Sequence, residues 1–173
     1  MPSFKYFIDW RVKVYSGFNL VYENDLNLKY KRVCIINESP SLGDFIAWMP
    51  FVEEFRKKHD CFVDFYTPNK ELFESEYPEI NFKNYGPSTT IYHATYRLGC
   101  FDVNDRNLSP KDHRLQNLQE VAAGILGLDY IEIKPKINLT NLKRKISDKY
   151  VCITTASTAG LKHWQNPDGW QQT

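Results

Sequence analysis

The fold is decided by the stretch Val33-Cys34-Ile35-Ile36-Asn37-Glu38-Ser39-Pro40-Ser41-Leu42-Gly43-Asp44-Phe45-Ile46-Ala47-Trp48-Met49-Pro50. A short apolar run rich in β-branched residues leads into a small polar turn, and apolar residues then recur at three- and four-residue steps. This pattern predicts a strand at 33–37 and a helix from about 42 to 59, the opening of a βα unit. Ligands of open α/β sheets bind beyond the carboxyl ends of the strands, so we expect this turn to face the functional site.

The segments that follow predict more strands of the same kind. Residues 61–66, 79–82 and 91–98 have strand-like composition, and turns or short helical stretches, such as the one around 70–75, separate them. Farther along, apolar residues from Leu115 to Leu128 have helical spacing and end at a glycine. The spacing is that of successive βα units, so we expect an α/β fold with a Rossmann-like parallel sheet.

Composition divides the chain into four parts. An alternating pattern around a Ser-Gly turn predicts a β-hairpin before the α/β body, and a polar, basic stretch near the end predicts a linker. The predicted parts are a hairpin appendage at 1–30, a Rossmann-like domain at 31–137, a linker at 138–148, and the first strand and turn of a second, truncated domain at 149–173.

Charge and cysteine content exclude several classes of protein. The 173 residues carry a net charge of +1, which gives no reason to expect nucleic acid as a partner. No apolar run approaches the length of a membrane span, and the N-terminus lacks the apolar core of a signal peptide. The four cysteines are widely separated and form no C-x-x-C pair, so we expect buried thiols and no bound metal. We therefore predict a soluble, cytoplasmic protein.

Asp44 is the candidate for chemistry in the first turn. Ser41-Leu42-Gly43-Asp44 fits the S-x-x-[DE] capping pattern, so the carboxylate has a structural role available to it at the helix N-terminus. The alternative is that Asp44 points out of the turn as a general base that takes a proton from an incoming hydroxyl. The spacing alone leaves both roles open.

A second small-residue turn, after the strand expected at 150–154, is the candidate for binding phosphate. Ser157 and Thr158 can donate hydrogen bonds to phosphate oxygens, and Lys162 supplies a positive charge. An ordinary surface loop with an exposed lysine would look the same. The chain contains no P-loop, D-x-D, G-x-S-x-G, H-E-x-x-H or G-x-G-x-x-G pattern, which weakens several other enzyme classes.

Several motifs in order resemble one family of enzymes. These motifs are Glu38–Pro50 followed by Val52–Arg56, then Tyr77–Ile80, Leu118–Ala122 with Ile125–Leu128, and finally Ser157–Ala159 with Lys162–Asn166. Together they resemble the ADP-heptose-using glycosyltransferases of the GT-B fold. The match is closest to the autotransporter strand-loop-strand O-heptosyltransferases, and the lipopolysaccharide heptosyltransferases are more distant. The resemblance runs from about Lys31 to the end of the chain.

The resemblance implies a reaction and assigns roles. It makes Asp44 the general base, with Ser41, Leu42 and Gly43 forming the turn around it, and it places Lys162, Ser157 and Thr158 on the donor diphosphate. The implied donor is ADP-heptose, and the implied acceptor is a serine hydroxyl of an autotransporter adhesin. Transfer in this fold is metal-independent, because lysine and helix N-terminal amides offset the charge of the leaving diphosphate.

Two departures from the family limit what this chain is expected to do. GT-B enzymes need a second α/β domain, of which only the beginning is present here. The family's iron site and cysteine cluster belong to a C-terminal region that this sequence lacks, and the family assembles as large rings, so a homo-oligomer is implied for the parent protein. We expect the chain alone to be inactive in transfer. The alternative is a non-catalytic, truncated α/β module that binds a protein or a sugar.

Overall fold

The computed structural model describes residues 4–102, 104–138, 140, 143 and 146–152, and the chain divides into two units, residues 1–140 and 141–173. All helices and strands described below belong to the first unit. Of the strand predicted at 150–154, the described residues up to Cys152 have no regular secondary structure. The remainder of that prediction, and the turn after it, lie outside the described residues.

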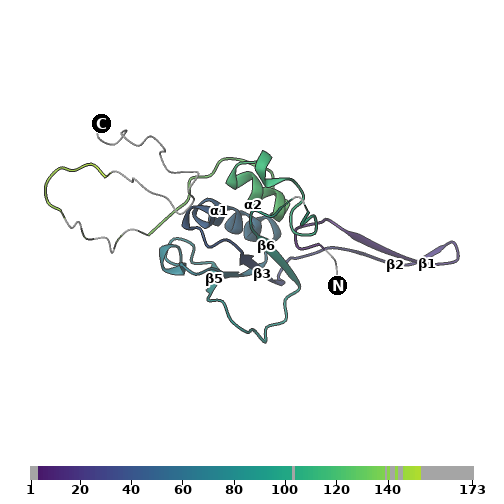
Figure 1. Cartoon of the computed structure of the whole chain (residues 1–173). Helices are drawn as coiled ribbons and strands as arrows, with labels where there is room; N and C mark the ends of the chain where they lie inside the picture. Colours follow the sequence, from purple (N-terminus) through teal and green to yellow (C-terminus); the bar gives the residue numbers. More distant parts are fainter. Residues whose placement is uncertain (1–3, 103, 139, 141–142, 144–145, 153–173) are drawn as a thin grey trace. The chain divides into compact units, whose positions relative to one another are not determined.

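A four-stranded parallel sheet forms the centre of the first unit (Figure 1). Its strands are β3 (Arg32–Asn37), β4 (Phe62–Tyr66), β5 (Ile80–Lys83) and β6 (Ala94–Leu98). They lie in the order β5-β4-β3-β6, and each neighbouring pair is parallel. The predicted Rossmann-like α/β fold is confirmed. The chain crosses from one side of β3 to the other before β6, so the strand order reverses between β3 and β6.

Helix α1 (Leu42–His59) has the predicted bounds and packs its apolar side against the sheet. Phe45, Trp48 and Phe55 are fully buried there. The helix ends where Asp60 adopts a left-handed backbone conformation with φ 48°. At the approximate 25 cal/mol per Å² of buried apolar surface, burial of each large aromatic side chain contributes about 2–3 kcal/mol, so these three α1 residues stabilise the core substantially.

Helix α2 (Leu118–Leu126) begins later than the apolar spacing predicts. Leu115 is 85% exposed and belongs to a short 3₁₀ turn, His113–Leu115. The helix starts instead at a capping box, in which the Asn117 side chain accepts from the backbone N–H of Glu120 and the Glu120 side chain accepts from that of Asn117. Helices α1 and α2 pack on each other on the same face of the sheet (Figure 1).

Residues 84–93, here called the strap, run from β5 to β6 on the other side of the sheet from α1 and α2 (Figure 1). Asp64, in the middle of β4, is only 2% exposed. Its carboxylate accepts from Asn81 at 2.8 Å and from the strap's Tyr92 hydroxyl at 2.9 Å. These charge-assisted hydrogen bonds satisfy the buried carboxylate and attach the strap to the sheet. The short helix predicted around 70–75 is a 3₁₀ turn, Lys70–Leu72.

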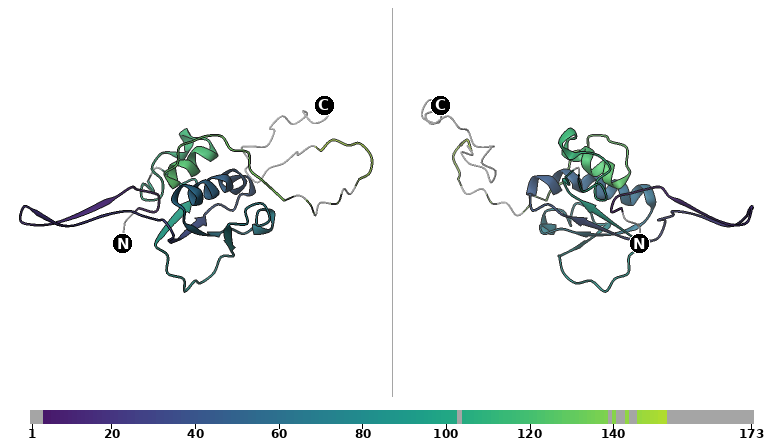
Figure 2. Two further views of the ribbon diagram at one scale, coloured as in Figure 1. Left: turned by 180° about the vertical axis from the view of Figure 1, so that it is seen from behind. Right: turned by 45° about the vertical axis from the view of Figure 1, so that its right-hand side comes forward.

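The predicted N-terminal hairpin is present as β1 (Arg11–Ser16) and β2 (Asn19–Asp25), joined at Gly17. The two strands pair antiparallel, and every residue in them is exposed. Figure 2 shows this two-stranded ribbon leading away from the sheet and helices. At its base, the Arg11 guanidinium pairs with the Asp25 carboxylate.

The N-terminal segment before the hairpin docks against α1 and α2. The backbone N–H of Phe7 donates to the carbonyl of Ile125 at 2.7 Å. The Phe7 ring lies 6.3 Å from the ring of Phe55 and 5.0 Å from that of His59. The end of α2 faces this ring, because a Cβ placed on Gly127 would lie 2.3 Å from an atom of Phe7.

Candidate functional site

Asp44 lies in the first turn of α1, beyond the carboxyl end of β3 and beside the point where the strand order reverses. Its side chain is half-buried, and its Oδ2 accepts a hydrogen bond of 2.5 Å from the Ser39 hydroxyl. Ligands of doubly wound α/β sheets bind at this edge and at this break in the strand order. The fold therefore places the candidate base where a ligand would bind.

The Ser41–Asp44 stretch fits the S-x-x-[DE] capping pattern in sequence, but it does not form that capping interaction in the structure. Ser41 is the N-cap residue of α1, but its hydroxyl makes no capping hydrogen bond. The Ser39 hydroxyl instead accepts from the backbone N–H of Ser41 at 3.1 Å while donating to Asp44. Ser41, Leu42 and Gly43 are all exposed around the carboxylate, and a Cβ on Gly43 would meet only the Ser41 hydroxyl, at 3.9 Å. The turn is therefore open to a ligand.

An ion pair between Arg97 and Glu38 lies at the same edge of the sheet. The Arg97 guanidinium, near the end of β6, donates twice to the Glu38 carboxylate, at 2.8 and 2.7 Å. The backbone N–H of Glu38 also donates to the Leu98 carbonyl at 2.7 Å. Hydrogen bonding to Glu38 raises the pKa of Arg97, so the guanidinium remains charged. It fixes the beginning of the Asp44 turn to the edge strand of the sheet.

Two more side chains border the turn. Partial burial and then the negative charge of Asp44 raise the pKa of the Cys100 thiol, even though Cys100 is exposed. Tyr85 of the strap donates from its hydroxyl to the carbonyl oxygen of Asn37, and burial followed by the charge of Glu38 raises its pKa. The site therefore draws on the β3–α1 turn, the end of β6 and the start of the strap.

The sequence did not assign roles to Ser39, Glu38, Arg97, Tyr85 or Cys100. Ser39 could have been found as a second serine in the polar turn, but the capping pattern pointed to Ser41. Glu38 lies in the same turn, next to Asn37, and its role appears only through its pairing with Arg97. Arg97 and Cys100 come to the site because β6 lies beside β3, and Tyr85 comes from the strap; no local sequence signal predicts these contacts. Lys162, Ser157 and Thr158 lie outside the described residues, so their predicted contact with a diphosphate stays a prediction.

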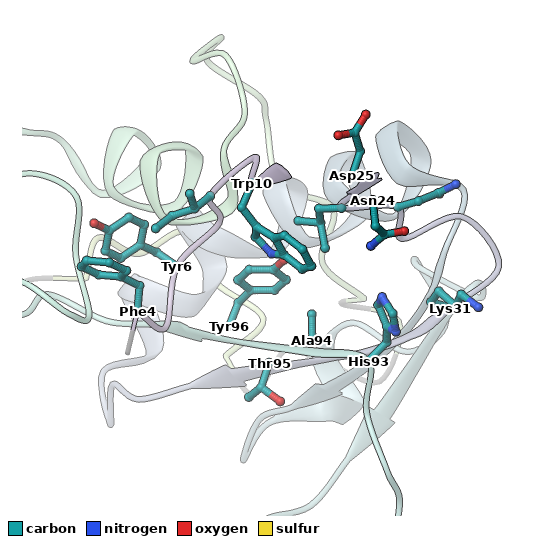
Figure 3. Close-up of a pocket in the computed structure, with 13 residues that line it drawn as sticks. Phe4, Tyr6, Trp10, Asn24, Asp25, Lys31, His93, Ala94, Thr95 and Tyr96 are labelled. Atoms are coloured by element: carbon teal, nitrogen blue, oxygen red, sulfur yellow. The ribbon is translucent and has the colours of Figure 1, made fainter. Parts of the chain in front are cut away.

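A separate pocket of about 650 Å³ lies at the other end of β3 and β6. Figure 3 shows Phe4 and Tyr6 at one end of it, Trp10 and Tyr96 in the middle, and Lys31 with His93 at the other end. Lys31 and His93 directly precede β3 and β6. The pocket is thus at the amino ends of these strands, and Asp44 does not line it.

The part of the chain that the structure describes contains no group of three His, Cys, Asp or Glu side chains that could hold a metal ion. Cys34 and Cys61 are buried, whereas Cys100 and Cys152 are exposed. Burial raises the pKa of the Cys34 thiol to about 12 and that of Cys61 to about 11, which keeps both thiols protonated. These residues do not fit an iron site. Among the described residues, none of the helices has the length and apolar character needed to cross a bilayer.

The fold and the placement of Asp44 define a Rossmann-like α/β domain with an acidic turn where the strand order reverses. No family model matches the chain. The autotransporter heptosyltransferase Aah of Escherichia coli is 36% identical over 97% of the chain and 44% of its own length. BimC of Burkholderia thailandensis, named an inactive autotransporter heptosyltransferase, is 29% identical over 97% of the chain and 41% of its own length.

Solved structures agree with these relatives. The chain matches a crystal structure of TibC from enterotoxigenic E. coli with a TM-score of 0.86 and 33% identity, over 98% of the chain and 45% of TibC. That TibC structure is described as a bacterial iron-containing dodecameric glycosyltransferase, and a second one contains ADP-D-β-D-heptose. The resemblance to the autotransporter heptosyltransferases is confirmed: the chain is their homologue over nearly all of its length. It spans slightly less than half of the length of the relatives that it matches.

Proposed function

We propose that this chain forms the acceptor-side part of a heptosyltransferase, in which Asp44 removes the proton from an acceptor hydroxyl as the heptose leaves ADP. The supporting observation is the position of Asp44, half-buried beside the break in the strand order. A carboxylate within hydrogen-bonding reach of a hydroxyl can act as its general base, an effect worth about 10²–10⁴-fold in rate. The sequence similarity to Aah and to TibC, which has been solved with ADP-heptose, supports the choice of donor and reaction.

The predicted roles of Lys162, Ser157 and Thr158 complete the proposal. Their side chains would bind the diphosphate of ADP-heptose and offset its growing charge as the sugar departs. The acceptor is proposed to be a serine of an autotransporter adhesin, in line with the names of the relatives. Transfer is proposed to need no metal at Asp44. Assembly into a homo-oligomer is proposed from the dodecameric TibC.

The test uses two proteins, the chain itself and a chimera in which it replaces the matching part of TibC. Transfer of heptose from ADP-heptose to a serine-containing adhesin segment is followed by mass spectrometry. We expect no transfer by the chain alone and measurable transfer by the chimera. Asp44→Asn in the chimera should reduce kcat by about 10²-fold or more, while the affinity for ADP-heptose stays the same. A near-normal kcat in Asp44→Asn would remove Asp44 from its proposed role.

The inactive relative BimC favours a second candidate, a non-catalytic module that binds a protein or a sugar. This candidate predicts that the chimera folds but transfers nothing. Calorimetry with ADP-heptose separates the two readings further, because loss of transfer with retained donor binding would place the defect in the acceptor-side part. Transfer by the chimera would exclude the non-catalytic module.

A further inference from the structure

Asn37 holds the residue that contacts Asp44. It is the last residue of β3 and only 1% exposed. Its side-chain oxygen accepts from the backbone N–H of Ser39 at 3.1 Å, and its side-chain NH₂ donates to the carbonyl of the same residue at 3.2 Å. Both polar groups of a buried amide are thus used on a single residue. Ser39 is fixed to the end of the strand by a side chain that has little room to move.

The hydroxyl of Ser39 is oriented by two hydrogen bonds. It accepts from the backbone N–H of Ser41 at 3.1 Å and donates to Asp44 Oδ2 at 2.5 Å. Because one lone pair of the oxygen is engaged by an N–H group, its proton is directed toward the carboxylate. The 2.5 Å distance between Ser39 Oγ and Asp44 Oδ2 is at the short end of the range for a hydroxyl that donates to a carboxylate. The contact therefore favours one rotamer of Asp44.

The second carboxylate oxygen of Asp44 is the one left for a ligand. The hydrogen bonds found among the described residues engage its Oδ2 and its backbone N–H, the latter donating to the Ser41 carbonyl at 3.2 Å. The neighbouring positions 41–43 are exposed. One oxygen is thus held from inside the turn, and the other is available on the open side.

We propose that Ser39, held by Asn37, is the positioning residue for the Asp44 carboxylate, turning one of its oxygens toward the acceptor hydroxyl. This inference rests on the proposed function of Asp44. A general base acts only when its oxygen lies within hydrogen-bonding distance of the proton that it removes. A displacement of about 1 Å can cost about 10²-fold in rate. Ser39 supplies orientation, and Asp44 accepts the proton.

The test compares Ser39→Thr with Ser39→Val. The two side chains have nearly the same shape, and only threonine keeps the hydroxyl, so any difference in packing affects both alike. Crystal structures of the chain should show the Asp44 carboxylate in its original orientation in Ser39→Thr and rotated away in Ser39→Val. An unchanged carboxylate in Ser39→Val would overturn the inference, and this measurement does not depend on catalysis.

Kinetics of the transferring protein give the second readout. Ser39→Val should lose about 10–10²-fold in kcat, with its KM for ADP-heptose within about twofold of the parent, and Ser39→Thr should recover most of the loss. Equal kcat values for the two variants would overturn the positioning role. If Asp44→Asn still transfers heptose at a near-normal rate, the proposed function fails. If Asp44→Asn loses transfer but Ser39→Val leaves kcat unchanged, the function of Asp44 stands and the positioning role of Ser39 is refuted.

Discussion

Replacing Gly127 by alanine is expected to destabilise the protein through one identifiable contact. Gly127 ends α2 with a left-handed backbone, φ 63°. A Cβ at this position would lie 2.3 Å from Cδ1 and 2.7 Å from Cγ of the Phe7 ring. Both atoms belong to a ring packed on α1, so neither can move without disturbing the N-terminal segment. Two costs therefore add, one from the backbone and one from the contact.

The magnitude follows from those two costs. An L-residue in the left-handed region costs about 1–2 kcal/mol, of which about 0.4–1 kcal/mol is recovered because alanine restricts the unfolded chain. Forcing the Phe7 ring aside costs about 1–3 kcal/mol, as for other overpacked sites. We expect Gly127→Ala to lower the free energy of unfolding by about 2–3 kcal/mol. The control, Gly17→Ala, has φ 62° with nothing within 4 Å of the added Cβ, and should cost at most about 1.6 kcal/mol.

Urea denaturation followed by circular dichroism measures both variants. The contact is isolated by introducing Gly127→Ala into a Phe7→Ala background, where the ring is absent. There the destabilisation caused by Gly127→Ala should fall by about 1–3 kcal/mol, the cost of the contact with the ring. The same cost in both backgrounds would refute the reasoning, since it would mean that Phe7 does not pack against the end of α2.

Three further expectations concern other parts of the first unit. Burial, and then the charge of Lys58, lower the pKa of His59 below 6.5, so the folded state holds fewer protons than the unfolded state and stability should fall as the pH drops below 6.5. A His59→Phe variant should lose this slope in melting temperature, and a retained slope would assign it elsewhere. Removing the negative charge in Asp44→Asn should lower the pKa of the Cys100 thiol and speed its alkylation by iodoacetamide at about pH 8. An unchanged rate would mean that the two groups lie apart. Finally, Asn117→Ala should lower the free energy of unfolding, measured by urea denaturation, by about 1 kcal/mol because it removes the N-cap of α2. Asn117→Asp should keep most of the stability, because aspartate also caps helices well.

The elements that the sequence predicted well are those with strong local signals. Helix α1 has the expected bounds because its apolar spacing, its polar N-terminal turn and its basic last turn all agree. The hairpin was found from alternation around Gly17. Helix α2 was extended too far toward Leu115, since the apolar period continued past the true start. The capping box from Asn117 to Glu120 was present in the sequence as the better signal.

The sequence predicted only part of the site, because some of its residues are brought together by the order of the strands and not by a local pattern. Asp44 and its turn follow directly from a strand-turn-helix pattern. Arg97 pairs with Glu38 only because β6 lies next to β3, and parallel neighbours far apart in sequence leave no periodic trace. The bond from Ser39 to Asp44 spans five residues within an irregular turn, a spacing that no capping pattern describes.

The ribbon of β1 and β2 has a thermodynamic consequence for the whole chain. No residue in it is buried, and Phe18 at its tip is fully solvated, so an isolated pair of strands must hold itself together with little apolar packing. Such a segment opens locally while β3 and β4 remain intact. Amide protons in the ribbon would then exchange with solvent many times for each exchange event in the central sheet. The ribbon and the sheet would therefore open with two different free energies.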